Sequence, residues 1–211
     1  MEKLPVENTA QKVGLKNKLA FASGDIFGGG SFNIINFLFV PFLTLTVGIP
    51  MYWVSVIMLI SKVWDGIIDP FIGKISDGKQ PGRFGKRRFF MLVCAPRLSV
   101  ATILLFFPWN LVTTSVPLKI VLVILVYLIY ATTQSFILIP YYSLGSEMSG
   151  DFIERTKVNS VRLGFSIFSS IVCVAVPGMI AAPEKGAQSY IVMAAIFGGI
   201  FCIAVLITAL F

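Results

Sequence analysis

Long apolar segments, separated by short polar ones, follow one another along this chain of 211 residues after a polar start. Each segment holds about 20 residues or more, which is the length that an α-helix needs to cross a bilayer. Glycine, proline and asparagine mark the turns between them. The pattern predicts an all-α membrane protein with six transmembrane helices, over residues 19–47, 51–72, 89–109, 117–144, 158–182 and 189–211.

The predicted organisation is a polar tail over 1–18 and one six-helix transmembrane domain over 19–211. The first span is long and contains Gly28, Gly29 and Gly30, so we expect it to bend or to pack closely against a neighbouring helix. The last span stops at Phe211, which favours half of a twelve-helix bundle over a complete six-helix protein.

Basic residues are concentrated on one side of the predicted membrane. The tail and the loops after the second and fourth spans hold twelve lysines and arginines, whereas the opposite side has only Lys119 and Lys185. Because cytoplasmic loops carry an excess of Lys and Arg, we expect a multi-pass protein of the cell (inner or plasma) membrane with a cytoplasmic amino terminus.

Composition narrows the possible functions. The chain is 56% hydrophobic and has a net charge of +7, but the positive charge lies in short loops between spans, which argues against a nucleic-acid partner. The absence of histidine excludes histidine-based catalysis and metal binding. The three cysteines lie in separate apolar segments and are interpreted as packing residues. We therefore predict neither an enzyme nor a cofactor.

Two carboxylates, Asp65 and Asp69, lie four residues apart within the second span. Lys62 precedes Asp65 by three positions. Each charge at the centre of a helix costs roughly 2.5–3.5 kcal/mol on insertion, and each large aliphatic residue returns only about 0.3–0.6 kcal/mol. The span therefore requires a wet cavity or countercharges from other helices. Ionisable groups at this depth usually mark an ion or proton path.

Helical spacing places Lys62, Asp65, Gly66, Asp69 and Gly73 on one face. Pro70 has no N–H group, so the Gly66 carbonyl loses its helical partner. Two carboxylates and this carbonyl could enclose a small hard cation such as Na⁺, or the carboxylates could share a proton. A third interpretation is that Lys62 simply neutralises Asp65 in an inert ion pair.

Other polar groups at membrane depth extend this candidate site. Three basic residues and three acidic residues lie within spans or at their ends, which suggests internal pairing around a polar cavity; they are Lys62, Arg97, Arg162, Asp25, Asp65 and Asp69. Asp77 is expected to cap a helix or to pair with Arg83 or Arg87, as a gate between neighbouring helices. Tyr142 could stack on a sugar ring and Gln134 could bind a hydroxyl, although an interfacial tyrosine can also serve packing alone.

Two long motifs resemble those of the glycoside–pentoside–hexuronide:cation symporters, a melibiose-permease-like branch of the major facilitator superfamily. The first runs from Asp65 through Asp69-Pro70, Gly73 and Ser76-Asp77 to Lys86-Arg87-Arg88. The second runs from Ile139-Pro140-Tyr141-Tyr142 to Glu154-Arg155-Thr156 and Arg162. The family fold has twelve helices in two halves, so the resemblance implies that this chain corresponds to the amino-terminal half.

The resemblance implies roles for single residues. Asp65 and Asp69 match the cation-site carboxylates, and Ser135 matches a hydroxyl position near them. Lys62 and Arg162 match basic positions of the charge network, and Tyr142 matches an aromatic that stacks on sugar. Ile68 replaces an asparagine of the sodium-using permease, and Gly29 and Leu138 stand where that permease has sugar-binding carboxylates.

The expected function is cation-coupled (H⁺ or Na⁺) symport of a sugar or glycoside by alternating access. The expected partners are the substrate, the coupling cation, the lipid bilayer and a carboxyl-terminal six-helix half. The alternative is a truncated, non-transporting chain that only binds or pairs with another half. Coding sequence beyond Phe211 would distinguish the two.

Overall fold

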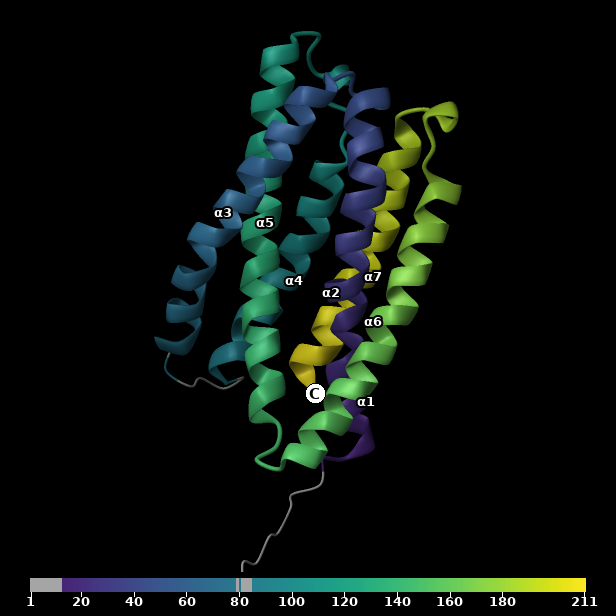
Figure 1. Ribbon diagram of the computed structural model, residues 1–211. Coiled ribbons are helices and arrows are strands. Elements are labelled where there is room, and N and C mark those ends of the chain that lie inside the picture. Colours follow the sequence, from purple (N-terminus) through teal and green to yellow (C-terminus); the bar gives the residue numbers. More distant parts are fainter. Residues whose placement is uncertain (1–12, 79, 81–84) are drawn as a thin grey trace, which may run out of the picture.

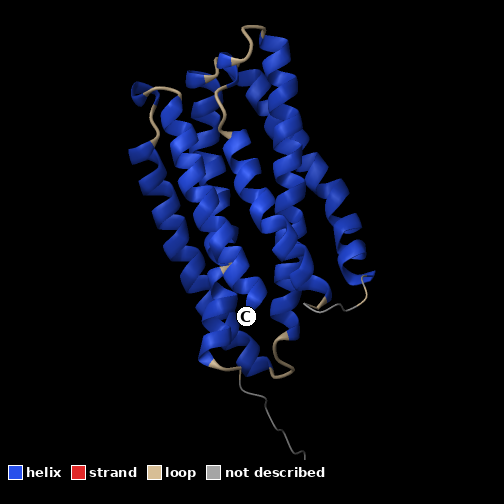
Figure 2. Cartoon of the chain, turned by 180° about the vertical axis from the view of Figure 1, so that it is seen from behind, coloured by secondary structure: helices blue, strands red, loops and turns tan. Residues whose placement is uncertain are grey.

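The computed structural model describes residues 13–78, 80 and 85–211, and it confirms the all-α architecture. Six helical stretches are long and apolar enough to cross a membrane. They lie side by side in one bundle (Figures 1 and 2), and the described part of the chain contains no strand. Their bounds are Leu15–Thr46, Met51–Gly78, Lys86–Leu105, Val116–Glu147, Phe152–Ile180 and Gln188–Leu210.

The first stretch is divided into four parts: α1 (Leu15–Ser23), α2 (Asp25–Ile34) and two π-helical turns, η1 (Ile35–Phe39) and η2 (Phe42–Thr46). Each other span is one helix: α3 (Met51–Gly78), α4 (Lys86–Leu105), α5 (Val116–Glu147), α6 (Phe152–Ile180) and α7 (Gln188–Leu210). Short 3₁₀ turns, η3 (Trp109–Leu111) and η4 (Pro183–Lys185), lie in loops. Helix α2 runs without a break through Gly28, Gly29 and Gly30, so the irregular positions of this span lie elsewhere, at Gly24 and in the two π-helical turns.

Helix packing follows a clear order. The most extensive contacts join α4 to α7, α4 to α5, α2 to α6 and α3 to α5. Helices α3 and α6 have the smallest fraction of buried residues among the six spans. Figure 1 shows them on opposite sides of the bundle. The exposed face of α3 carries large apolar residues, among them Leu59, Val63, Ile67 and Phe71.

Glycines allow the first span to approach its neighbours closely. A Cβ atom on Gly29 would lie 2.4 Å from Ser166 Oγ, and one on Gly30 would lie 2.4 Å from Ser169 Oγ, both on α6. The Ser169 hydroxyl donates a hydrogen bond of 2.7 Å to the Ile26 carbonyl across the same interface. The predicted close packing of this glycine segment is therefore confirmed, with α6 as the partner.

An aromatic cluster fills the core on the side away from the basic loops. Phe39 contacts Phe106 and Tyr127 edge to face, with ring centroids 5.6 and 5.1 Å apart, and Phe42 contacts Phe106 and Tyr190. These rings come from the π-helical end of the first span, α5, α7 and the residue after α4. They bury large apolar surfaces and hold this end of the bundle together.

The starts of α1, α4 and α6 and the ends of α3 and α5 lie together at the lower end of Figure 1. The described lysines and arginines near these helix ends make this the basic end of the bundle. The helices here are longer than predicted: α3 reaches Gly78 instead of residue 72, α5 reaches Glu147, and α6 starts at Phe152. The first helix starts at Leu15, inside the predicted tail. Backbone hydrogen bonding continues after the apolar pattern stops, because helices do not require apolar side chains outside the hydrocarbon core.

The third span is shifted toward the amino terminus, since α4 begins at Lys86 instead of residue 89. Helix α4 ends at Leu105, although the apolar run suggested residue 109. Pro108 accounts for the difference, because a proline lacks the donor that a helix needs and disfavours helical backbone in the residue before it.

Filling the α2–α6 contact should destabilise the bundle. We predict that Gly30→Val lowers the melting temperature of the detergent-solubilised protein, because the new side chain must displace Ser169 and Cys173. The expected cost is about 1–3 kcal/mol. Gly164→Val on α6, where an added Cβ meets nothing within 4 Å, is the control. Equal melting temperatures for the two variants would contradict the close contact.

Candidate transport site

A polar pocket of about 430 Å³ lies between α2, α5 and α6. Its walls are Asp25, Gly28, Gly29, Tyr142, Arg162, Leu163 and Ser166. Asp25, Tyr142 and Arg162 were selected from sequence, and the structure brings all three together. Ser166 was not predicted, since a serine in an apolar helix gives no signal of its own until its partners are known.

Arg162 is the central charge of this pocket. Its guanidinium lies over the Tyr142 ring, with Cζ 5.4 Å from the ring centroid, which is a cation–π geometry. Its Nε lies 3.9 Å from Asp25 Oδ2. That distance is too long for a hydrogen bond, and Nε is buried without a hydrogen-bond partner among the described residues. The loose pair leaves hydrogen-bonding capacity for a ligand.

The local structure fixes the positions of these side chains. Tyr141, next to Tyr142, is buried, stacks on Phe21 with centroids 4.7 Å apart and donates a hydrogen bond of 3.1 Å to the Phe21 carbonyl. These contacts dock α5 onto α1. The Tyr142 ring lies beside the Tyr141 ring, with centroids 5.4 Å apart, and about half of the Tyr142 surface is exposed. Tyr141 therefore has a packing role, and Tyr142 is the tyrosine available to a ligand.

A second, narrow pocket contains the other group of predicted residues. Lys62, Asp65 and Gln134 line it, together with Asn36 and Ser61. Gln134 is thus separated from Tyr142 and lies instead beside the predicted cation site. Asn36 is a further polar group in this pocket that the sequence analysis missed. It lies on the π-helical turn η1, a backbone feature that often marks functional sites but that cannot be recognised from the sequence.

Lys62 and Asp65 form an ion pair of 3.4 Å one turn apart on α3. The predicted pairing is therefore present. The side chains are 63% and 28% exposed, so the pair is open to whatever surrounds α3 and can exchange partners. A weak, accessible pair of this kind is compatible with binding and release of a cation.

Asp69 behaves differently from Asp65. The residue is half-buried, and its Oδ1 atom is shielded without a hydrogen-bond partner among the described residues. A shielded carboxylate oxygen without a hydrogen-bond partner is costly and leaves binding capacity for a ligand. Ser135 is buried in α5 and lines neither of the two pockets. The described residues contain no group of three or more acidic or cysteine ligands, so a metal ion here would need hydroxyl, amide or carbonyl oxygens as well.

Ion pairs connect the helices at the basic end. Arg87 on α4 donates to Asp77 at 3.1 Å and lies 3.0 Å from Glu147, so it links α3, α4 and α5. Of the two predicted partners of Asp77, Arg87 is the one observed, and Arg83 lies outside the described residues. A second group joins α1 to α6: buried Glu154 pairs with Lys18 at 2.7 Å and with Lys157 at 2.8 Å. The i, i+3 spacing in the sequence indicates the Glu154–Lys157 pair, but not the pair between Glu154 and Lys18.

Residues 20–211 match the family described as MFS/sugar transport protein, and the chain belongs to this family, among glycoside–cation symporter-like members of the major facilitator superfamily. The fold is accordingly half of a bundle of that superfamily. The relatives are transporters and not enzymes.

Three relatives illustrate the match. The chain is similar to the uncharacterized symporter YjmB of Bacillus subtilis strain 168, with 32% identity over 73% of this chain and 33% of that protein. It is 26% identical to a glucuronide carrier protein homolog of Escherichia coli strain K12, over 78% and 35% of the two chains. It is 27% identical to the sphingosine-1-phosphate transporter MFSD2B of Xenopus tropicalis, over 62% and 25%. The matches thus span about a third of the relatives' length or less.

The Arg87 contacts should stabilise the basic end. We predict that Arg87→Gln lowers the melting temperature in detergent by the equivalent of about 1 kcal/mol, because two carboxylates on two other helices lose their shared cation. Arg88→Gln, which removes only one hydrogen bond to the Phe211 carbonyl, is the matched control. The difference should shrink at high salt; a loss that salt does not change would show that packing, and not charge, is responsible.

Proposed function

We propose that this chain is the amino-terminal half of a cation-coupled symporter for a sugar or glycoside. The observation that carries the proposal is the Asp25–Tyr142–Arg162 pocket, a polar site with an aromatic face between transmembrane helices. A sugar presents hydroxyl groups to charged partners and a flat apolar face to an aromatic ring, and the pocket offers both. Family membership gives the general transport function, and the pocket supports the substrate class.

The proposed cation site consists of Asp65 and Asp69, with Lys62 as the group that a cation displaces. Among the described residues, Lys62 is the ion-pair partner of the partly exposed Asp65, and the shielded Oδ1 atom of Asp69 has no hydrogen-bond partner. Binding of H⁺ or Na⁺ at Asp65 would release Lys62 and change the charge of the pocket that also contains Gln134. Ser135 is proposed as a further oxygen near this site on the basis of the family resemblance.

The second half of the transporter is proposed to cover α3 and α6. These helices are the least buried of the six, and α3 exposes a row of large apolar side chains. The two halves would then rock about the site between them, as in other transporters built from two bundles. Arg87 and its carboxylate partners lie where such a movement would open the basic end, which we propose to be cytoplasmic.

Neutralising the carboxylates should uncouple transport. We predict that Asp65→Asn and Asp69→Asn in the assembled twelve-helix transporter abolish accumulation of substrate against its gradient, with sodium and pH varied separately in vesicles. Substrate exchange should remain, because the Tyr142–Arg162 pocket is intact. Glu184→Gln, on the η4 loop, is the control and should transport normally. Accumulation that persists in both aspartate variants would reject the cation role.

The substrate pocket has its own test. We predict that Tyr142→Phe keeps exchange, since stacking is retained, whereas Tyr142→Ala and Arg162→Gln each weaken substrate binding by about tenfold or more. Binding should be measured for three ligands in parallel: neutral glycosides, uronides and sphingosine-1-phosphate. A response only to the lipid would replace the sugar proposal, and unchanged binding of sugars in both variants would remove these residues from the site.

A further inference from the structure

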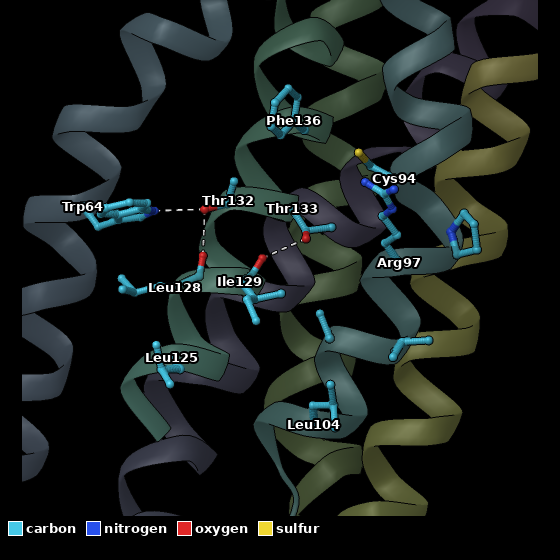
Figure 3. Close-up of a pocket in the computed structure, with 13 residues that line it drawn as sticks. Trp64, Cys94, Arg97, Leu104, Leu125, Leu128, Ile129, Thr132, Thr133 and Phe136 are labelled. Carbon is cyan, nitrogen blue, oxygen red and sulfur yellow. Dashed lines mark hydrogen bonds between the residues drawn. The ribbon is translucent and has the colours of Figure 1, made fainter. Parts of the chain in front are cut away.

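A third cavity, larger than the two pockets described above, lies between α3, α4 and α5. It has no part in the proposed transport site. It encloses about 830 Å³, which is the size of a site for a drug-sized or lipid-sized molecule. Its lining is mostly apolar, and Figure 3 shows Trp64, Arg97 and Thr132 around it from three different helices. Helices α3 and α4 make few direct contacts with each other, which leaves this groove open between them.

Arg97 is the only charged residue among those that line the groove. It lies about 16 Å along α4 from Lys86 and about 12 Å from Leu105, so its backbone is deep within the span. The residue is exposed, and no described carboxylate lies within ion-pair distance of it. An unpaired guanidinium at this depth is costly, and it is rare unless it faces water, a countercharge or a ligand.

The groove is divided into a polar and an apolar part. In Figure 3, Thr132, Thr133 and Arg97 lie at a similar level, and the Arg97 guanidinium lies beside Cys94. Leu104 and Leu125 lie toward one end, away from the guanidinium. Trp64 donates a hydrogen bond of 2.9 Å to the Thr132 hydroxyl, which ties α3 to α5 and closes one wall. The cavity therefore has an anion-binding group at one end and an apolar trough at the other.

We propose that this groove binds a single-chain amphiphile with a carboxylate head, a long-chain fatty-acid anion. The planar guanidinium matches a carboxylate in a two-pronged geometry, and the apolar trough accepts the alkyl chain. A fatty acid has one chain and can reach the depth of Arg97 as the neutral acid before it ionises there, whereas a phospholipid has two chains and a phosphate that stays charged. The site is separate from the Asp25–Tyr142–Arg162 pocket, so the proposal does not depend on the transported substrate.

Trp64 provides a direct probe, because it lines the groove. Trp53 and Trp109 are first replaced by phenylalanine, which leaves Trp64 as the single tryptophan of the chain. The purified chain in phosphatidylcholine nanodiscs is then titrated with 9,10-dibromostearate, whose bromines quench tryptophan on contact. We expect saturable quenching by the acid and much weaker quenching by its methyl ester, which lacks the charge.

Arg97→Gln should weaken the binding of dibromostearate by about tenfold or more, as expected for loss of a charged hydrogen-bonding pair. Val100→Phe, which narrows the apolar trough without adding a second tryptophan, should also weaken binding. Arg88→Gln, outside the groove, should leave binding unchanged. Matched melting temperatures establish that the variants are folded.

Three results would overturn the proposal. Non-saturable quenching that Arg97→Gln does not alter would make the groove an ordinary lipid-facing surface. Absence of quenching would show that protein covers it. Stronger competition by a lysophospholipid than by stearate would assign the head group to a phosphate instead of a carboxylate.

Discussion

The close approach of α2 to α6 is the contact on which the transport site depends. Gly29 and Gly30 leave no room for a side chain against Ser166 and Ser169, and the Ser169 hydroxyl bonds to the Ile26 carbonyl. Within a membrane, where water does not drive helices together, small residues and interhelical hydrogen bonds supply this association. The same interface sets Asp25 opposite Arg162, because both residues lie within about a turn of the contact.

The charges at membrane depth form two kinds of pair. At the basic end, Arg87 lies close to Asp77 and Glu147, and Glu154 lies close to Lys18, so these pairs join helices. Deeper in the bundle, the pairs are incomplete: Arg162 is 3.9 Å from Asp25, and Asp69 has an unpaired oxygen. The close pairs between helices stabilise the bundle, whereas the loose Arg162–Asp25 pair and the shielded Asp69 oxygen leave binding capacity for an ion or a substrate.

Most of the architecture could be predicted because membrane helices follow a simple rule of length and apolar content. All six spans were located, and the errors lie at their ends, where α3 and α6 continue into polar sequence. The candidate site was predictable in part: Asp25, Tyr142 and Arg162 were chosen as unusual polar residues in apolar segments. Ser166 and Asn36 were missed, since polar residues that are small or neutral are common in such helices.

The sequence by itself determined the number of spans, the side on which basic residues gather and the identity of the ionisable groups, because each depends on local composition. Only the tertiary structure decided how these groups are divided: Gln134 with Lys62 and Asp65, Tyr142 with Arg162 and Asp25, and Arg97 alone beside a third cavity. Residues far apart in the chain meet because each helix has a particular rotation about its axis and a particular depth in the bundle. Packing among all the helices sets this rotation and depth, so no single segment of the sequence determines them.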